Sequence, residues 1–333
     1  MANLNYGEIK TLLEKILIKY GFSKTDADLT SEIFTDNTFS GVASHGVNRF
    51  AAFIKLAKEG FIVPDAKPKL IKSFGAWEQW DGQLGPGPLN SLLITDRVMK
   101  LAKENGIGCV ALRNTNHWMR AGTYGWKAAE NGFILICWTN TIPILPPWGA
   151  KESTTGNNPF VLAVPRKNGH VVLDMALSLF SYGKLSSYRR EGNQLPFIGG
   201  YDSDGNLTTD AGKIYDAKRP LPIGYWKGSG LSLLFDLIAT IMSGGKSTME
   251  LGQSETDSGM SQIYIALDPS KSMSAESIDK IADEIINYYK SAEPETGEQI
   301  LYPGERVKLN REKYKREGFE IDDNIYSKIT DLL

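Results

Sequence analysis

Apolar residues recur with the spacing of a helix face at both ends of the chain. Near the N-terminus such stripes predict helices over 6–20, 24–40 and 47–58, which stop at or beside Gly21, Gly41 and Gly60. Ser23 with Asp26 resembles a capping box for the second helix. Toward the C-terminus, helices are predicted over 274–291 and 306–317. The expected core face of the first of these two carries Ile278, Ile281, Ile285 and Tyr288.

Between these ends, from about residue 68, short apolar runs typical of strands alternate with helical segments. The runs predict strands at 107–113, 133–138, 160–164, 171–175 and 262–267. Helices are expected between them at 89–104, 120–130 and 230–243. We therefore predict a mixed α/β core with a helical domain formed from both chain ends. The expected boundaries are an N-terminal helical segment 1–70, an α/β domain 71–269, and a C-terminal helical segment 270–333 that packs with the first.

Composition narrows the class of protein. With 333 residues, the chain is long enough to form a full hydrophobic core. Its net charge of -2 lacks the excess of positive charge that is typical of nucleic-acid-binding proteins. No run of about 20 apolar residues predicts a membrane span, and no signal-peptide pattern opens the chain. Cys109 and Cys137 lie in apolar runs, which favours free thiols in the cytoplasm. No metal is expected, because no cysteine pair has zinc spacing and the three histidines are far apart in sequence.

The most informative short segment is Ser44-His45-Gly46-Val47-Asn48-Arg49-Phe50, at the start of the third predicted helix. Histidine titrates near neutral pH, and arginine matches a carboxylate with two parallel hydrogen bonds. One side chain can therefore move a proton while the other holds an acid, at a helix N-terminus that favours anions. The alternative is a capped helix end with a solvated histidine and arginine.

A second polar segment, Arg113 to Trp118, follows the predicted strand 107–113. His117 should therefore lie just past a strand end, where ligand sites of α/β proteins collect. A structural histidine is the alternative reading.

A glycine fingerprint for a dinucleotide, Gly-x-Gly-x-x-Gly, is absent. Gly85-Pro86-Gly87 is better explained as a tight turn, because its prolines remove amide donors. Gly228-Ser229-Gly230 opens the predicted helix 230–243 and suits either a phosphate contact or a plain helix start. Gly156-Asn157-Asn158-Pro159 suits either a turn or recognition of a polar cofactor edge. Basic residues at 306–317 alternate with glutamates, so a solvated helix face is favoured over a phosphate-binding arm.

Taken together, several long runs are similar to the type 2 malate/L-lactate dehydrogenase family and, within it, to the enzymes that reduce 2,3-diketo-L-gulonate. The matching runs are SHGVNRF (44–50), ALRNTNHWMRAGTYGW (111–126), CWTNTIPILPPWGAKE (137–152), GNNPF (156–160), LDMALSLFSYGKL (173–185) and GYWKGSG (224–230). The resemblance implies a fold of the L-sulfolactate dehydrogenase type, which is not a Rossmann fold. It also implies a homodimeric reductase that uses NADH or NADPH on a small keto acid. The missing glycine fingerprint is then explained.

The same resemblance assigns roles to individual residues. It implies that His45 donates the proton to the keto oxygen and that Ser44, Arg49 and His117 line the substrate pocket. Cofactor contacts are implied for His170, Val171, Val172, Leu173, Asp174, Met175, Ala176, Trp226, Lys227, Gly304, Glu305 and Arg306. An extra residue near 167–170 and the pair Glu305-Arg306 depart from the family pattern. Both departures fall in cofactor segments, so the choice between NADH and NADPH stays open.

Three other functions compete with this reading. A sister enzyme acting on malate, lactate, ureidoglycolate or a cyclic imino acid would use the same chemistry in a different pocket. A serine hydrolase built on Ser44 and His45 is disfavoured, because adjacent residues rarely face each other and the Gly-x-Ser-x-Gly elbow is absent. A non-catalytic protein would not need both His45 and Arg49.

For the homodimer, an aromatic-rich interface is expected from Tyr124, Trp126, Trp138, Trp148 and Trp226, with core packing as the alternative for some of them.

Overall fold

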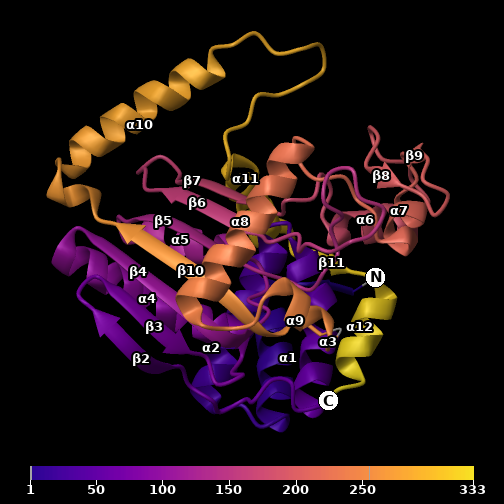
Figure 1. The fold of residues 1–333 in the computed structure, drawn as a ribbon, viewed down its shortest axis with the longest axis horizontal. Helices are drawn as coiled ribbons and strands as arrows, with labels where there is room; N and C mark the ends of the chain where they lie inside the picture. The colour runs from indigo at the N-terminus through magenta and orange to yellow at the C-terminus, as the bar shows by residue number, and fades with distance from the viewer. Residues whose placement is uncertain (1, 255) are drawn as a thin grey trace.

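A seven-stranded mixed sheet forms the centre of the computed structural model, which describes residues 2–254 and 256–333 (Figure 1). In spatial order its strands are β2 (Lys69–Phe74), β3 (Trp77–Asp81), β4 (Ile107–Asn116), β10 (Ser258–Leu267), β5 (Ile134–Thr139), β6 (Phe160–Val164) and β7 (Val171–Met175). The pair β3–β4 is parallel and the other neighbouring pairs of this sheet are antiparallel. A Rossmann sheet is mostly parallel. The prediction of a mixed α/β core outside the Rossmann class is confirmed.

The five strands predicted from apolar runs all form, and β4 and β10 are longer than predicted. The hairpin β2–β3 was not expected from the sequence. Strand β2 is exposed along its length, and β3 reads Trp-Glu-Gln-Trp-Asp, so neither shows an apolar run. Glu78 in β3 is only 1% exposed and pairs with Arg97 at 2.5 Å. A buried charge is tolerated in a strand when such a partner neutralises it.

Helices cover both faces of the sheet. On one face α4 (Gly87–Asn105) and α5 (Gly122–Glu130) bury Val98, Leu101 and Trp126 against Val110 and Leu135. On the other face α8 (Trp226–Ser243) places Ala239 against Ala111, Trp138 and Ile263. The sheet is therefore the middle layer of three, as Figure 1 shows.

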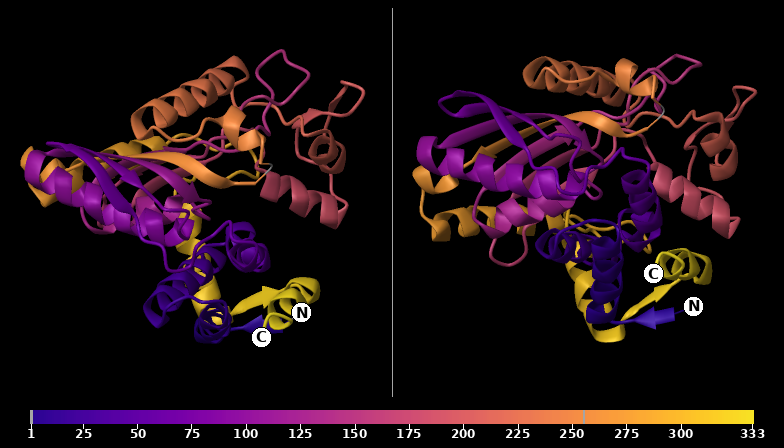
Figure 2. Two further views of the ribbon diagram at one scale, coloured as in Figure 1. Left: turned by 60° about the horizontal axis from the view of Figure 1, so that its bottom comes forward. Right: turned by 90° about the horizontal axis from the view of Figure 1, so that it is seen from below.

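The two chain ends form the helical domain below the sheet in Figure 2. It contains α1 (Tyr6–Lys19), α2 (Lys24–Phe39), α3 (Val47–Lys58), α11 (Glu305–Glu317) and α12 (Asp323–Thr330). Strand β1 (Ala2–Leu4) pairs antiparallel with β11 (Phe319–Ile321). Ile321 and Ile329 join Leu13, Phe34 and Phe50 in one core. The predicted helical domain built from both ends is confirmed, while its boundaries at residues 70 and 269 stay a proposal.

The segment of the chain between β7 and α8 forms a small lobe. It consists of α6 (Tyr182–Glu191), β8 (Gly200–Tyr201), β9 (Leu207–Thr208) and α7 (Ala211–Ala217), around a core of Phe180, Leu185, Leu195, Ala211 and Ile214. Short elements complete the chain: η1 (Ala43–His45), α9 (Thr248–Gly252) and η2 (Pro269–Lys271). Gly183 at the start of α6 packs against Ser44, so this lobe reaches the polar segment that begins α3.

Helix α10 (Ala275–Lys290) forms where it was predicted, but its expected core face is wrong for the single chain. Ile281, Ile285 and Tyr288 are 44%, 62% and 83% exposed. The helix stands away from the body in Figure 1 and is held by an ion pair of Asp283 with Arg166 at 2.5 Å. Its apolar stripe has no layer to pack against within the described part of one chain.

Both cysteines are free, as predicted, with Cys137 buried and Cys109 half-buried. Burial raises the pKa of Cys109 to about 11, so its thiol stays protonated and unreactive at neutral pH. Across residues 2–254 and 256–333, no helix combines the length and the apolar character that crossing a bilayer requires.

Candidate active site

Two histidines that are 72 residues apart in sequence lie face to face. The rings of His45 and His117 are stacked, with centroids 5.7 Å apart and planes 16° from parallel. His45 ends η1, and His117 follows the last residue of β4. The structure thus brings together the two histidines that the sequence analysis picked out of separate polar segments.

Close packing of α2 under η1 fixes the position of His45. A Cβ atom added at Gly46 would lie 2.2 Å from Thr38 Oγ1 and 2.9 Å from the Phe34 carbonyl oxygen, so only glycine fits there. The buried Asn37 amide donates to the His45 carbonyl oxygen at 2.9 Å, and Val47 N donates to Thr38 Oγ1 at 3.0 Å. These contacts hold the turn on a rigid helix, as a catalytic group requires.

Strand pairing places His117 and Asp257 at one edge of the sheet. Ser258, the first residue of β10, pairs with Asn116, the last residue of β4. Since the two strands are antiparallel, the residue before Ser258 and the residue after Asn116 leave the sheet at the same place. The sequence analysis missed Asp257, because nothing local marks an acid 140 residues away as a neighbour of His117.

Arg49 is the charged centre of this group. It lies in the first turn of α3, and its Nη2 is 3.8 Å from Asp257 Oδ2. Its side chain is 43% exposed, so it can be reached from solvent. The Arg49 charge also lowers the pKa of both histidines. A guanidinium beside two imidazoles can bind the carboxylate of a small acid and present the rest of it to the rings.

Burial lowers the pKa of His45 to about 3, and the positive charges of His117, Arg49 and Arg120 add to this. Burial followed by Arg49 lowers the pKa of His117 to about 3 as well. Both side chains are enclosed by protein although each keeps some solvent contact. At neutral pH the two imidazoles are therefore uncharged, and His45 can accept a proton.

Hydrogen bonds constrain where the ring protons lie. Met119 N donates to His117 Nδ1 at 3.0 Å, so the proton of neutral His117 is on Nε2. Ser44 Oγ lies 3.1 Å from His45 Nδ1. A hydrogen bond between Ser44 Oγ and His45 Nδ1 can orient the ring, and Nε2 is then available to contact a ligand.

Two of the three predicted cofactor segments meet. Val172 N donates to the Pro303 carbonyl oxygen at 2.9 Å, which joins β7 to the start of α11. Gly304 has φ +97°, and a Cβ there would come within 3.1 Å of Val172 N and 3.2 Å of the His170 carbonyl oxygen. His170 packs edge-on against Trp126, with ring centroids 5.6 Å apart. The stretches 170–172 and 303–304 thus pack directly against each other.

The third segment, Trp226-Lys227, follows a stretch that is tied to the end of the β7 segment, because Ile223 N donates to the Leu177 carbonyl oxygen at 2.9 Å. Trp226 is 66% exposed. Helix α8 begins here rather than at residue 230, so Gly228-Ser229-Gly230 lies inside its first turns and the predicted start was wrong.

Polar contacts connect the His45 turn to β7. Asn37 Oδ1 accepts from Thr123 Oγ1 at 2.7 Å, and Gly122 N, at the start of the same helix, donates to Asp174 Oδ2 at 2.9 Å. Buried Arg120 lies 3.5 Å from Asp174 through Nε, while its Nη1 has no hydrogen-bond partner among the described residues. Arg120 lies in the NHWMRAGTYGW run, but the sequence analysis gave it no role. An unpaired, buried guanidinium nitrogen marks a place for an anionic or carbonyl group.

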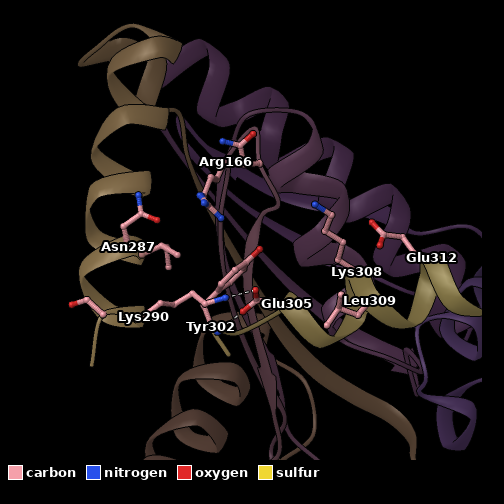
Figure 3. A pocket seen from close by; sticks show the side chains of 11 residues that line it. Arg166, Asn287, Lys290, Tyr302, Glu305, Lys308, Leu309 and Glu312 are labelled. Atoms are coloured by element: carbon pink, nitrogen blue, oxygen red, sulfur yellow. Dashed lines mark hydrogen bonds and ion pairs between the residues drawn. The ribbon is translucent and has the colours of Figure 1, made fainter. Parts of the chain in front are cut away.

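A cavity of about 440 Å³ borders the second cofactor segment (Figure 3). Its wall is formed by one side of α11, with Glu305, Lys308 and Leu309, and by Tyr302, Arg166 and the end of α10. Lys290, at the end of α10, pairs with Glu305 of α11 at 2.5 Å. The volume lies within the range of small-molecule sites.

The loop Gly156-Asn157-Asn158-Pro159 is a turn that is held by hydrogen bonds of the Asn158 side chain. The buried Asn158 amide donates to the Ser232 carbonyl oxygen at 2.8 Å, and its Oδ1 accepts from Thr141 N at 3.1 Å. Both ends of the carboxamide are engaged within the protein. The alternative, recognition of a cofactor edge by Asn158, is therefore not supported.

Comparison with known proteins agrees with the fold. The family model of malate/L-lactate dehydrogenase matches residues 4–330, and the chain belongs to this family. It is accordingly an oxidoreductase.

Individual relatives cover the chain from end to end. The 2,3-diketo-L-gulonate reductase of Escherichia coli (strain K12) is 45% identical over 331 residues, which are 99% of each chain. Among solved structures, sulfolactate dehydrogenase from Methanocaldococcus jannaschii is 33% identical, with a TM-score of 0.89 over 99% of this chain and 96% of that one. Malate dehydrogenase from Pyrococcus horikoshii OT3 is 27% identical, with a TM-score of 0.89 over 99% and 94%.

Proposed function

We propose that this chain is an NAD(P)H-dependent reductase that converts 2,3-diketo-L-gulonate to 3-keto-L-gulonate. The observation that carries the proposal is the stacked pair His45–His117 beside Arg49, which combines a proton-transfer group and a carboxylate clamp in one pocket. The 45% identity to a 2,3-diketo-L-gulonate reductase supports the choice of substrate. Reduction of another small 2-keto acid, of the malate, lactate or ureidoglycolate type, is the alternative.

The residues present fit a nicotinamide cofactor. Buried Arg120 leaves Nη1 without a partner among the described residues, and its Nε lies 3.5 Å from Asp174 of the first predicted cofactor segment, so a carbonyl or phosphate oxygen of the cofactor would find a donor there. The two contacting segments, His170 to Ala176 and Gly304 to Arg306, would carry the nucleotide, with the cavity of Figure 3 beside Glu305. When bound, the reduced cofactor supplies a hydride to the keto carbon.

Residues of this chain bind the substrate and neutralise the negative charge that develops on the keto oxygen during this transfer. Arg49 binds the substrate carboxylate with its planar fork and so sets which face of the keto group is presented. His45 gives a proton to the keto oxygen as negative charge develops there. Because burial and positive neighbours lower the pKa of His45 to about 3, this proton must be taken up when the anionic substrate offsets those positive charges.

The experiment that tests the function is an assay of nicotinamide absorbance decay. Purified enzyme is given NADH or NADPH with 2,3-diketo-L-gulonate, pyruvate or oxaloacetate. Ureidoglycolate, which is a hydroxy acid, is tested in the reverse direction with NAD⁺ or NADP⁺, where absorbance would rise. We expect the highest kcat/KM with 2,3-diketo-L-gulonate. No turnover with any of these acids would contradict the proposal, and a preference for another acid would favour the alternative.

A pH dependence follows from the lowered pKa of His45. Free enzyme with neutral His45 must bind one proton to be active in reduction, so kcat/KM for reduction should fall about tenfold per unit of pH between about pH 6 and 8. The kcat/KM for oxidation should be level over the same range, since the base form is already present. A flat profile for reduction would show that the proton does not come through His45 from solution.

We further propose that the enzyme is a homodimer and that α8 lies in the interface. Its outer face is apolar and exposed in the single chain, with Leu233, Leu234, Leu237 and Ile241 at 53%, 52%, 46% and 72%. Such a face is costly in water unless a partner covers it. Of the aromatics expected at the interface, Tyr124, Trp126 and Trp138 are core residues, so that expectation was wrong for them, while Trp148 and Trp226 are exposed.

Sedimentation at micromolar concentration should therefore give about twice 36.8 kDa. Ile241→Asp should shift the mass toward that of one chain and lower specific activity, because a charge cannot be buried in an apolar contact. Leu207→Asp makes the same change at a 52% exposed site on β9 and should leave the dimer intact. A fully active Ile241→Asp monomer would show that one subunit is sufficient for activity, and an unchanged mass would contradict an interface at α8.

We infer a cytoplasmic location from the two free thiols, which suit a reducing compartment.

A further inference from the structure

Gly183 lies where the small lobe meets the turn that carries His45. It is the second residue of α6, and a Cβ atom there would lie 2.9 Å from Ser44 Cβ and 3.1 Å from Ser44 Oγ. Carbon atoms in contact are normally about 3.5–4.0 Å apart. The backbone of α6 therefore comes closer to Ser44 than a residue with a side chain would allow.

The backbone conformation at this position does not require glycine. Gly183 is not among the glycines with a positive φ, and it lies in the first turn of an α-helix that Ser181 caps. Alanine is the more favourable residue in a helix. The close contact with Ser44 is thus the feature that the missing side chain serves.

The start of α6 is fastened on both sides of this contact. Tyr182 Oη donates to the Ile144 carbonyl oxygen at 2.9 Å, outside the lobe. Within the lobe, the Tyr182 ring packs edge-on against Tyr215 of α7, with ring centroids 5.5 Å apart. The contact between Gly183 and Ser44 therefore belongs to a fixed junction, and α6 cannot move away from Ser44 without breaking these interactions.

Ser44 connects this junction to His45. Its Oγ lies 3.1 Å from His45 Nδ1. The next residue, Gly46, is packed against α2, where a Cβ atom would lie 2.2 Å from Thr38 Oγ1. The turn from Ser44 to Gly46 is thus held between α6 and α2. A side chain at position 183 would press on Ser44 and move its hydroxyl relative to the His45 ring.

We propose that Gly183 is a positioning residue for His45, which holds the Ser44 hydroxyl against His45 Nδ1 and so keeps the imidazole in the orientation that proton transfer needs. Gly183 does this by leaving room for Ser44, and it touches no reacting atom itself. A functional side chain is held precisely when the residues around it are locked by packing. The effect of this contact on rate rests on the proposed function, whereas the placement of the ring rests on the contacts alone.

The expected effect follows from the distance that is missing. A methyl group at position 183 needs about 3.5 Å where 2.9 Å is available, so Ser44 must move by about half an ångström. A displacement of about 1 Å at a catalytic group can cost about 10²-fold in rate. We therefore expect Gly183→Ala to lower kcat about tenfold and to leave the affinity for NADH unchanged.

The kinetic test is a cycle of variants at the two positions in contact, with Gly183→Ala, Ser44→Gly and both changes together. In the Ser44→Gly background no side chain is left to displace, so Gly183→Ala should have no further effect on kcat there. Gly212→Ala is the matched control, because Gly212 is likewise the second residue of a helix in the same lobe. The atom nearest to a Cβ at Gly212 is Asp210 Oδ1, 3.3 Å away at the end of a side chain. Its kcat should equal that of wild type.

A spectroscopic measurement follows the ring itself. The chain has three histidines, so the ring resonances of protein labelled with ¹⁵N in histidine can be assigned with His45→Gln and His170→Gln. Gly183→Ala and Ser44→Gly should both shift the ring ¹⁵N resonances of His45, because each disturbs the hydroxyl contact with Nδ1. The His170 resonances should stay in place in both variants, and the His45 resonances should stay in place in Gly212→Ala.

An unchanged kcat, or unchanged His45 resonances, in Gly183→Ala would overturn the role of Gly183. So would effects of Gly183→Ala and Ser44→Gly that multiply in the double variant, since Gly183 would then act by another route. If Gly183→Ala alone does not fold, the double variant should fold and Ser44→Gly should still shift the His45 resonances, and failure of either expectation contradicts the proposal. Absence of turnover by wild type with every keto acid would refute the proposed function, whereas the resonance shifts do not depend on it.

Discussion

Replacing His45 by glutamine should lower kcat about 10²-fold or more while nicotinamide binding persists. Glutamine keeps the size and polarity of the side chain but cannot deliver a proton, and a positioned general acid contributes about 10²–10⁴-fold in rate. The residue lies on η1 and is not part of the segments His170 to Ala176 and Gly304 to Arg306 that would carry the cofactor. Steady-state kinetics and a fluorescence titration with NADH measure the two effects separately.

The same substitution at another histidine provides the contrast. His170→Gln changes the predicted cofactor surface, where His170 Nδ1 accepts from Arg166 N at 3.2 Å. It should weaken cofactor binding and leave kcat at saturating cofactor within a few-fold of wild type. Near-normal turnover of His45→Gln would show that His45 is not the proton donor.

Arg49→Lys should raise KM for a keto acid about 10- to 100-fold, with a smaller change in kcat. An ammonium group cannot reproduce the two parallel hydrogen bonds of a guanidinium. A hydrogen bond to a charged group contributes about 1.5–3 kcal/mol, and each 1.4 kcal/mol corresponds to about a tenfold change in affinity. Initial rates over a range of keto-acid concentrations, at saturating cofactor, give both constants.

Arg189→Lys is the matched control, because Arg189 pairs with Asp216 on the surface of the small lobe and lies outside the proposed site. Its KM should equal that of wild type. If Arg49→Lys also left KM unchanged, Arg49 would have a structural role through Asp257 and would not bind the carboxylate.

Local patterns in the sequence were sufficient for most elements of the fold. The apolar run Val171–Met175 was predicted with the bounds that β7 has, and the stripe over 47–58 matches α3. These elements bury an apolar face, and such a face is visible as a period in the sequence. Strand β3 was missed because its burial depends on a partner, with Glu78 neutralised by Arg97 from α4.

The site was only partly predictable for a related reason. His45 and Arg49 stand four residues apart and share one helix start, so their local spacing was informative. Asp257 and Asn37 act through contacts that the fold creates, at 3.8 Å with Arg49 and at 2.9 Å with the His45 carbonyl oxygen. Antiparallel pairing of β10 with β4 makes the first of these contacts, and a single sequence shows no sign of that pairing.

The apolar faces of α8 and α10 show where periodicity misleads. Leu237 and Ile285 have the spacing of core residues, yet they are 46% and 62% exposed in one chain. A stripe that packs within the chain and a stripe that packs against another molecule have the same period. Sequence alone could therefore predict these helices but not what covers them.

The central claim is that hydride passes from a nicotinamide cofactor to a keto carbon in this pocket. It is tested most directly by supplying NADH or NADPH that carries deuterium at the transferable position, with 2,3-diketo-L-gulonate, and by analysing the product by mass spectrometry and NMR. The account predicts a reduced sugar acid with one deuterium bound to the former keto carbon, formed by wild type and about 10² times more slowly by His45→Gln. Product without deuterium, or cofactor consumption without a reduced sugar acid, would contradict it.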